Sequence, residues 1–371
     1  MTTDSEFEIF LVTAPGHEAV LCAEARAKGF KAAKATAGGV TIKGGWPDVW
    51  RANLELRGAG RVLARLGSFR VSHLAQLDKL ARRFPWGNVL RKDVPFRVDV
   101  TCKGSRIYHS GAAAERIQRA IVEDFGAPHS DEAEVCIKAR IDNDVCTIGI
   151  DTSGDLLHKR GHKEAVSKAP MRETMASLFL RQCGYDGGEP VVDPMCGSGT
   201  FVIEAAEIAA GLKPGRSRHF AFEELATFDR AAWLSMRGTA GATNPGFKFY
   251  GSDRDAGAIR MSRANAARAG ATDWTEFQQV AISELAAPVG SPGLVIVNPP
   301  YGDRIGDKKS LQPLYRALGQ TLLTRFHGWR VGLITSDTSL ARTCELPFAP
   351  PGAPVAHGGL RVTLFLTGPL K

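Results

Sequence analysis

Strand-like and helical segments alternate along residues 171–371, and this alternation constrains the fold more than any other feature of the sequence. Apolar runs predict strands at 190–192, 247–251, 276–280, 294–297 and 330–334, and amphipathic patterns predict helices at 171–183, 200–210, 256–269 and 311–326. Regular alternation of this kind predicts a doubly wound α/β domain on a parallel sheet. The runs 354–357 and 360–366 meet at Gly358 and Gly359 and predict a hairpin added to that sheet.

The first part of the chain predicts a separate α+β domain that ends near Asp151. Its predicted strands are 8–13, 39–42, 69–71, 96–100, 135–139 and 145–151, and its predicted helices are 16–28, 48–66 and 110–125. Residues 154–170 are polar and basic and lack periodic apolar positions, which indicates a connector between domains. A length of 371 residues also fits two domains better than one.

The sequence carries no sign of a membrane or secretory destination. No stretch reaches the roughly 18 apolar residues that a spanning helix needs, and residues 1–8 are polar and acidic, unlike a signal peptide. We therefore expect a cytoplasmic protein without a membrane partner. The seven cysteines are scattered and form no CxxC pair, so neither a disulfide framework nor a metal site is expected.

Positive charge is concentrated in one region. The formal net charge is +8, and residues 51–100 hold eleven Lys and Arg against four Asp and Glu. Such an excess fits a polyanionic partner, although a solvated helix face explains Arg57, Arg61 and Arg65 equally well, because they recur every four residues. The predicted contacts to nucleic acid are Arg82 and Arg83 in this region and Lys159 and Arg160 in the connector.

The first chemical motif is a glycine turn between a short strand and a helix. In an open α/β sheet this position is the ligand crevice at the carboxyl ends of the strands. The predicted cofactor-binding residues are Asp193, Pro194, Gly197, Ser198, Gly199 and Thr200. The glycines permit a tight turn close to a ligand, and Asp193 can accept a hydrogen bond from an ammonium or a backbone amide. Val202 stands where a dinucleotide fingerprint needs Gly or Ala, which argues against a dehydrogenase.

The second motif is a pair of carboxylates after the strand 247–251. A carboxylate at the tip of this strand is placed to bind both hydroxyls of an adenosine ribose. Asp253 is the preferred candidate because it lies nearest the strand end. Asp255 is the alternative, but it also stands where a helix N-cap is needed.

The third motif is the most specific one: the apolar strand 294–297 runs into Asn298-Pro299-Pro300-Tyr301. The prolines fix the backbone and project the Asn298 carboxamide into the crevice. A carboxamide oxygen and a neighbouring carbonyl can bind both hydrogens of an exocyclic base amine and free its lone pair to attack a sulfonium methyl group. Tyr301 offers an aromatic face for the base. We therefore predict that these four residues are catalytic, and that Asn298 also contacts the cofactor.

These motifs resemble those of a known family. Residues 193–200, 251–253 and 298–304 resemble the methyltransferase domain of bacterial RNA guanine-N2 methyltransferases that carry a THUMP domain, notably the N-terminal half of the bifunctional 23S ribosomal RNA enzyme. The resemblance extends to residues 38–40, 157–162 and 169–174 and so covers nearly the whole chain.

The resemblance implies a ferredoxin-like part at 1–45, a THUMP RNA-binding domain at 46–153, a linker at 154–170 and a class I methyltransferase domain at 171–371. It implies S-adenosylmethionine as the cofactor and methylation of guanine N2 in 23S ribosomal RNA, free or within a ribosome assembly intermediate. Ala281 departs from the family, which has an acidic residue there facing the adenine amino group. The adenine contact is therefore expected to be weaker or to come from elsewhere.

Three alternatives remain open. A guanine-N2 methyltransferase acting on tRNA shares the motifs. An N6-adenine DNA methyltransferase would also use Asn-Pro-Pro-Tyr, but a THUMP-like domain favours structured RNA. A non-catalytic RNA-binding assembly factor is supported by Ala281 alone, against the intact Asp193, Asp253 and Asn298.

Overall fold

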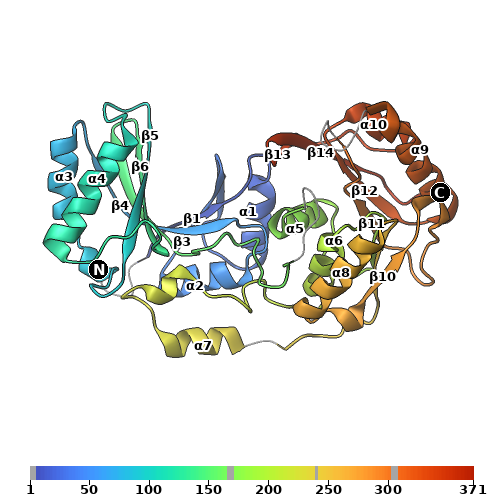
Figure 1. The fold of residues 1–371 in the computed structure, drawn as a ribbon, viewed down its shortest axis with the longest axis horizontal. Coiled ribbons are helices and arrows are strands. Elements are labelled where there is room, and N and C mark those ends of the chain that lie inside the picture. The colour runs from blue at the N-terminus through green and yellow to red at the C-terminus, as the bar shows by residue number, and fades with distance from the viewer. Residues whose placement is uncertain (1–5, 165–170, 239–240, 302–307) are drawn as a thin grey trace. The chain divides into compact units, whose positions relative to one another are not determined.

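The computed structural model describes residues 6–164, 171–238, 241–301 and 308–371 (Figure 1). Contacts between residues divide the chain into two units. The N-terminal unit consists of residues 1–13, 21–157 and 215–239, and the C-terminal unit consists of residues 14–20, 158–214 and 240–371. Each unit holds one seven-stranded sheet. The N-terminal unit therefore includes a segment, 215–239, that lies far along the sequence.

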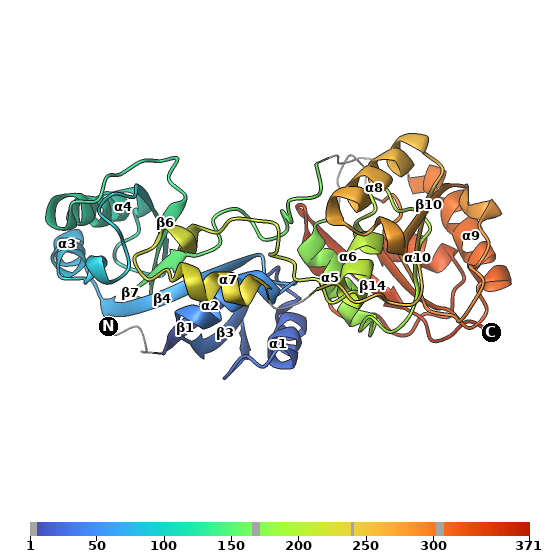
Figure 2. The same cartoon turned by 90° about the horizontal axis from the view of Figure 1, so that it is seen from below.

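The sheet of the N-terminal unit has the strand order β2-β3-β1-β4-β7-β6-β5. Its strands are β1 (Phe7–Val12), β2 (Lys34–Thr36), β3 (Gly39–Gly44), β4 (Arg61–Arg70), β5 (Phe96–Lys103), β6 (Val135–Asp142) and β7 (Val145–Asp151). Its helices are α1 (Glu18–Ala27), α2 (Trp46–Glu55), α3 (Leu74–Arg82), α4 (Ser110–Ala120) and α7 (Arg230–Gly238). Helix α7 contacts α2 although the two are far apart in sequence, as Figure 2 shows. Neither α3 nor α7 was predicted.

The prediction of a single helix at 48–66 is wrong. Helix α2 ends at Glu55, and β4 begins at Arg61. Strand β4 pairs with β1 on one side and β7 on the other, and its first six residues alternate between half-buried and buried, with Val62, Ala64 and Leu66 buried. Pairing with two neighbouring strands overrides the helical spacing of the arginines. The explanation of Arg61 and Arg65 as part of a helix face is therefore also wrong.

The sheet of the C-terminal unit has the strand order β10-β9-β8-β11-β12-β14-β13. Its strands are β8 (Val191–Asp193), β9 (Phe249–Asp253), β10 (Thr275–Gln279), β11 (Leu294–Val297), β12 (Arg330–Thr335), β13 (Val355–His357) and β14 (Leu360–Leu366). Its helices are α5 (Glu173–Gln182), α6 (Thr200–Ala209), α8 (Ala256–Ala269), α9 (Lys308–Arg325) and α10 (Thr338–Thr343). The first five strands are parallel, and β13 and β14 form the antiparallel hairpin that the sequence predicts.

Strand β11 shows why this sheet needs an apolar sequence. All four of its residues are buried, and they alternate between two hydrophobic clusters, with Ile296 in one and Val297 in the other. A parallel sheet covered on both faces requires such unbroken apolar strands. The chain reverses its direction of winding between β8 and β11, and ligands of doubly wound sheets bind at this switch point. No helix among the described residues is long and apolar enough to cross a membrane.

Candidate active site

The glycine turn after β8 requires its glycines. Gly197 and Gly199 have positive φ values of 53° and 82°, in the left-handed region that other residues avoid. A Cβ atom at Gly199 would also lie 3.1 Å from the side chain of Ser262. Two side chains of α8 anchor the turn. Ser262 Oγ donates to the Gly197 carbonyl at 2.8 Å, and Asn265 Nδ2 donates to the Ser198 carbonyl at 3.0 Å. Neither of these anchors was predicted from the sequence, although they lie three residues apart on one helix face.

Asp193 ends β8 and is 3% exposed. Its Oδ1 accepts a hydrogen bond from the Met195 amide at 3.1 Å. Burial, with a smaller contribution from the Asp253 carboxylate, raises the pKa of Asp193 to about 8 from its ordinary value of 3.8. A cation placed beside this carboxyl would favour its ionised form again. Asp193 is therefore suited to bind an ammonium group.

The two carboxylates after β9 have different roles. Asp253 Oδ2 accepts from the Gly197 amide at 3.1 Å, and its Oδ1 accepts from the Asp255 amide at 2.9 Å. Asp255 caps α8 by accepting from the Gly257 amide at 2.6 Å. Asp253 thus joins the end of β9 to the glycine turn, whereas Asp255 has the capping role that its position predicts. The carboxyl ends of β8 and β9 meet at one polar site.

Asn298 directly follows β11 at the same edge of the sheet. It is half-buried, and its Oδ1 atom is buried without a hydrogen-bond partner among the described residues. An unmet buried acceptor costs free energy on the order of 1–3 kcal/mol, and a substrate donor could supply the missing bond. The next two residues, Pro299 and Pro300, have no backbone N–H to offer.

Tyr301 is less accessible than its predicted role as an aromatic face for the base requires. It is 9% exposed and packs in the hydrophobic cluster that includes Met175 and Phe179 of α5. Burial raises the pKa of Tyr301 to about 12. Its ring therefore presents little free face on which a base could stack in this structure. The motif residues Gly302, Asp303 and Arg304 lie outside the described residues.

The predicted connector carries buried ion pairs. Arg160 and Glu204 of α6 are 2% and 1% exposed and lie 3.4 Å apart, whereas Lys159 is exposed. Lys163 Nζ donates to Thr200 Oγ1 at 2.9 Å and to the Met171 carbonyl at 2.7 Å. The connector thus packs on the start and the middle of α6, and the Arg160 guanidinium is not available at the surface to an RNA phosphate.

The predicted nucleic-acid contacts on α3 also differ from one another. Arg82 forms ion pairs with Asp78, Glu123 and Asp124. Three carboxylates around one guanidinium leave little net positive charge for a phosphate. Arg83 is exposed.

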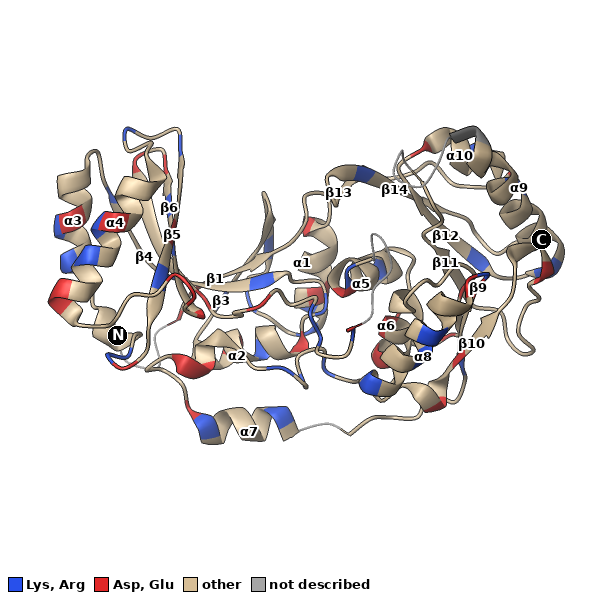
Figure 3. Cartoon of the chain, in the orientation of Figure 1, with Lys and Arg blue, Asp and Glu red and all other residues tan. Residues whose placement is uncertain are grey.

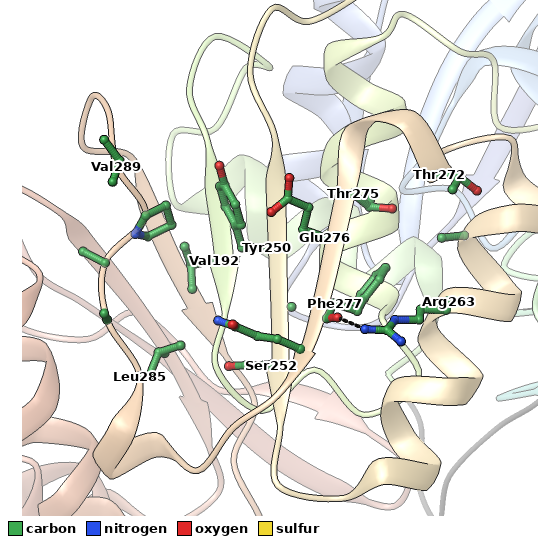
Figure 4. A pocket seen from close by; sticks show the side chains of 16 residues that line it. Val192, Tyr250, Ser252, Arg263, Thr272, Thr275, Glu276, Phe277, Leu285 and Val289 are labelled. Atoms are coloured by element: carbon green, nitrogen blue, oxygen red, sulfur yellow. Dashed lines mark hydrogen bonds between the residues drawn. The ribbon is translucent and has the colours of Figure 1, made fainter.

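A cavity of about 670 Å³ lies beside the edge strand β10 and extends to Val192 of β8 and to Gly251 and Ser252 of β9. Tyr250, Glu276 and Gln278 line it, together with the loop 285–289 (Figure 4). Figure 4 also shows Arg263 donating to the Phe277 carbonyl at 2.6 Å. Its lining thus includes Gly251 and Ser252 of the motif 251–253, but not Asp193, the turn 197–200, Asp253 or Asn298.

Comparison with known families matches three regions of the chain. Residues 8–63 match the RlmL ferredoxin-like domain, residues 71–151 match the THUMP domain, and residues 160–347 match the RMKL-like methyltransferase domain. The last match covers slightly more than half of the chain.

Individual relatives agree with these matches. The ribosomal RNA large subunit methyltransferase K/L of Vibrio campbellii is 31% identical over an alignment of 344 residues, and the alignment covers 89% of this chain and 49% of the relative. The chain thus spans about half the length of the curated relatives it matches. A solved structure described as methyltransferase SMU.472, complexed with SAH, is 28% identical with a TM-score of 0.89 and 99% coverage of both chains. A Listeria monocytogenes protein described as a predicted N6-adenine-specific DNA methylase is 28% identical with a TM-score of 0.88, and 98% of this chain and 97% of that chain are covered.

Proposed function

The chain belongs to the family of RMKL-like methyltransferases that carry an RlmL ferredoxin-like domain and a THUMP domain, and we propose that it methylates an exocyclic base amine in RNA. The observation that carries this proposal is the buried and unpartnered Oδ1 atom of Asn298. A base amine is the kind of donor that this acceptor lacks. The finer proposal is guanine N2 of 23S ribosomal RNA, and it is supported by the likeness to the K/L enzymes.

The site fits S-adenosylmethionine, the cofactor of the family. The left-handed glycines let the backbone approach a ligand closely, and the buried Asp193 is suited to an ammonium such as that of the methionine part. We propose that the turn 197–200 and Asp253 hold the cofactor at the carboxyl ends of β8 and β9. When bound, S-adenosylmethionine supplies an electrophilic methyl group.

The residues of the chain contribute mainly by orientation. Asn298 Oδ1 accepts a hydrogen bond from the target amine and turns the nitrogen lone pair toward the methyl group. This bond strengthens as the nitrogen becomes tetrahedral, so it lowers the barrier more than it aids ground-state binding. No general base is required, because the methylated nitrogen can release its proton to water.

The N-terminal unit offers a surface that fits RNA better than Arg82 or Arg160. We define the tip surface as the exposed side chains of Arg70, Lys103, Arg106 and Tyr108. Arg70 and Lys103 have no ion-pair partner among the described residues, and Tyr108 is 85% exposed. Cations beside an exposed aromatic ring are typical of surfaces that bind unpaired nucleotides.

Backbone hydrogen bonds connect the segments that carry the tip surface. Three segments meet there, because the Val71 amide donates to the Asp144 carbonyl at 2.9 Å and the Asn143 amide donates to the Lys103 carbonyl at 3.2 Å. Asp144 also accepts from the Arg106 amide at 2.8 Å. Figure 3 shows Lys and Arg on the loops at these ends of β5 and β6. We propose that RNA is captured at this end of the sheet.

The test is single-turnover methylation of RNA taken from a strain that lacks the protein, with labelled cofactor. Asn298→Ala should lower the rate on the order of 10²–10³-fold, by comparison with lost oxyanion-hole donors, and should change cofactor affinity little. Asn244→Ala is the matched control, because Asn244 is exposed and, among the described residues, its side chain accepts a hydrogen bond from the Gly246 amide of its own loop. An Asn298→Ala protein that turns over within a few-fold of the wild type contradicts the mechanism.

The substrate is tested by mass spectrometry of nucleosides from the same strain. Loss of N2-methylguanosine from ribosomal RNA supports the finer proposal. Its loss from tRNA alone would move the substrate to tRNA, and loss of N6-methyladenine from DNA would favour the DNA enzyme.

A further inference from the structure

Tyr315 is a fully buried residue of α9, and its hydroxyl bonds to the loop that carries Asn298. The hydroxyl donates to the Pro300 carbonyl at 3.1 Å and lies 3.2 Å from Thr335 Oγ1. Burial raises the pKa of Tyr315, so the hydroxyl stays protonated and remains a donor at every working pH. Neither Tyr315 nor Thr335 belongs to any of the three sequence motifs.

The Tyr315 hydroxyl is itself anchored to the sheet. Thr335 is the last residue of β12 and is fully buried, and its Oγ1 accepts from the Asp337 amide at 3.2 Å. Asp337 in turn caps α10 by accepting from the Ser339 amide at 2.8 Å and the Leu340 amide at 3.2 Å. A chain of hydrogen bonds therefore runs from the start of α10 through the end of β12 to the loop after β11.

This anchorage matters because of the two prolines. Pro299 and Pro300 have no N–H group, so at these positions the loop can be fixed by hydrogen bonds only through its carbonyl oxygens. The Pro300 carbonyl lies two residues beyond Asn298, whose Oδ1 has no partner of its own. A donor on Pro300 consequently limits the directions in which this part of the loop can turn.

We propose that Tyr315 is a positioning residue for methyl transfer, whose hydroxyl fixes the Pro300 carbonyl and thereby the direction of the Asn298 carboxamide. The inference rests on the proposed function. Tyr315 does not touch the reacting atoms and acts through the loop, with Thr335 as its support.

A merely structural role must be separated from this one, and the chain offers a matched control. Tyr185 is also a buried tyrosine, and its hydroxyl also donates to a backbone carbonyl, that of Ala205 in α6, at 2.9 Å. Tyr185→Phe and Tyr315→Phe therefore remove the same kind of bond. Among the described residues, the Tyr315 hydroxyl bonds to the loop that carries Asn298, whereas the Tyr185 hydroxyl bonds to α6.

The experiment compares both variants with the wild-type chain in single-turnover methylation, calorimetry of cofactor binding and thermal unfolding. Tyr315→Phe should lower the methylation rate on the order of tenfold while cofactor affinity stays within twofold, and Tyr185→Phe should leave the rate within twofold. Both should lower the unfolding temperature by similar amounts. Thr335→Val should lower the rate by a smaller factor, and Thr335→Ser, which keeps the hydroxyl, should restore it.

The outcomes are distinct. Equal rates for the two phenylalanine variants, or a rate loss matched by an equal loss of cofactor affinity, overturns the positioning role while the proposed function stands. If the wild type transfers no methyl group to any RNA although it binds the cofactor, the proposed function fails and the inference fails with it.

Discussion

Charged groups on the connector and α3 contrast with the polar groups at the carboxyl edge of the parallel sheet. Arg160 and Arg82 have carboxylate partners, and so the charge that marks them in the sequence is neutralised in the structure. At the sheet edge, by contrast, Asp193 is buried at the cost of a raised pKa and Asn298 Oδ1 has no partner among the described residues. Paired charge therefore belongs to the scaffold at Arg160 and Arg82, whereas the candidate site combines a buried carboxyl of raised pKa with an unpartnered acceptor.

The largest effect is expected from breaking the buried pair in the connector. Arg160→Ala leaves the Glu204 carboxylate buried without that partner, and such a loss typically costs about 3–5 kcal/mol. We expect a large fall in the thermal unfolding temperature, measured by calorimetry. The salt dependence of RNA binding by the folded variant should stay unchanged.

Lys159→Ala is the control for this prediction, because Lys159 is the exposed neighbour. It should leave the unfolding temperature nearly unchanged. If RNA binding by Arg160→Ala depends less steeply on salt than that of the wild type and the unfolding temperature is unchanged, Arg160 contacts RNA. Arg160 would then not be a scaffold residue.

The next effect depends on pH and is expected at Asp193, where the change in stability over one pH unit is smaller than the loss expected at Arg160. Its folded pKa of about 8 lies above the ordinary value of 3.8, so the folded protein keeps a proton that the unfolded chain loses. Stability should therefore fall as pH rises from 4 to 8, by up to roughly 1.4 kcal/mol per pH unit, and level off above pH 8. Asp193→Asn should lack this slope, which chemical denaturation at several pH values can measure.

Cofactor binding should favour the ionised form of Asp193, whereas folding favours the protonated form. An ammonium beside the carboxyl favours its ionised form, so the affinity advantage of the wild type over Asp193→Asn should grow from pH 6 to pH 8. Asp186→Asn, at an exposed carboxylate, provides the control. A constant affinity ratio across this range would mean that Asp193 does not ionise on binding.

The difference between local and long-range information explains what the sequence could predict. The glycine turn and the Asn298 loop follow directly after short apolar strands, so their place at the sheet edge is readable from neighbouring residues. The strand nature of β4 depends on pairing with β1 and β7, which no local pattern contains. The partner of Arg160 lies on another element, and the segment 215–239 joins a unit far from it in sequence. Charge density in the sequence therefore predicted RNA contacts at Arg82 and Arg160, which are paired with carboxylates in the structure.

The smallest effect is expected from Arg70 and Lys103, the two cations of the tip surface that have no ion-pair partner among the described residues. Each phosphate contact contributes by counterion release, so its loss should lower the slope of log affinity against log salt by about 0.7–0.9 units. We expect Arg70→Gln and Lys103→Gln each to produce such a change and to weaken RNA binding a few-fold, measured by fluorescence anisotropy at several salt concentrations. Arg82→Gln is the matched control, because three carboxylates already neutralise its guanidinium, and it should leave the slope unchanged. If Arg82→Gln lowers the slope and the tip variants do not, RNA binds along α3. A carboxylate partner would then not mark an arginine of this protein as structural.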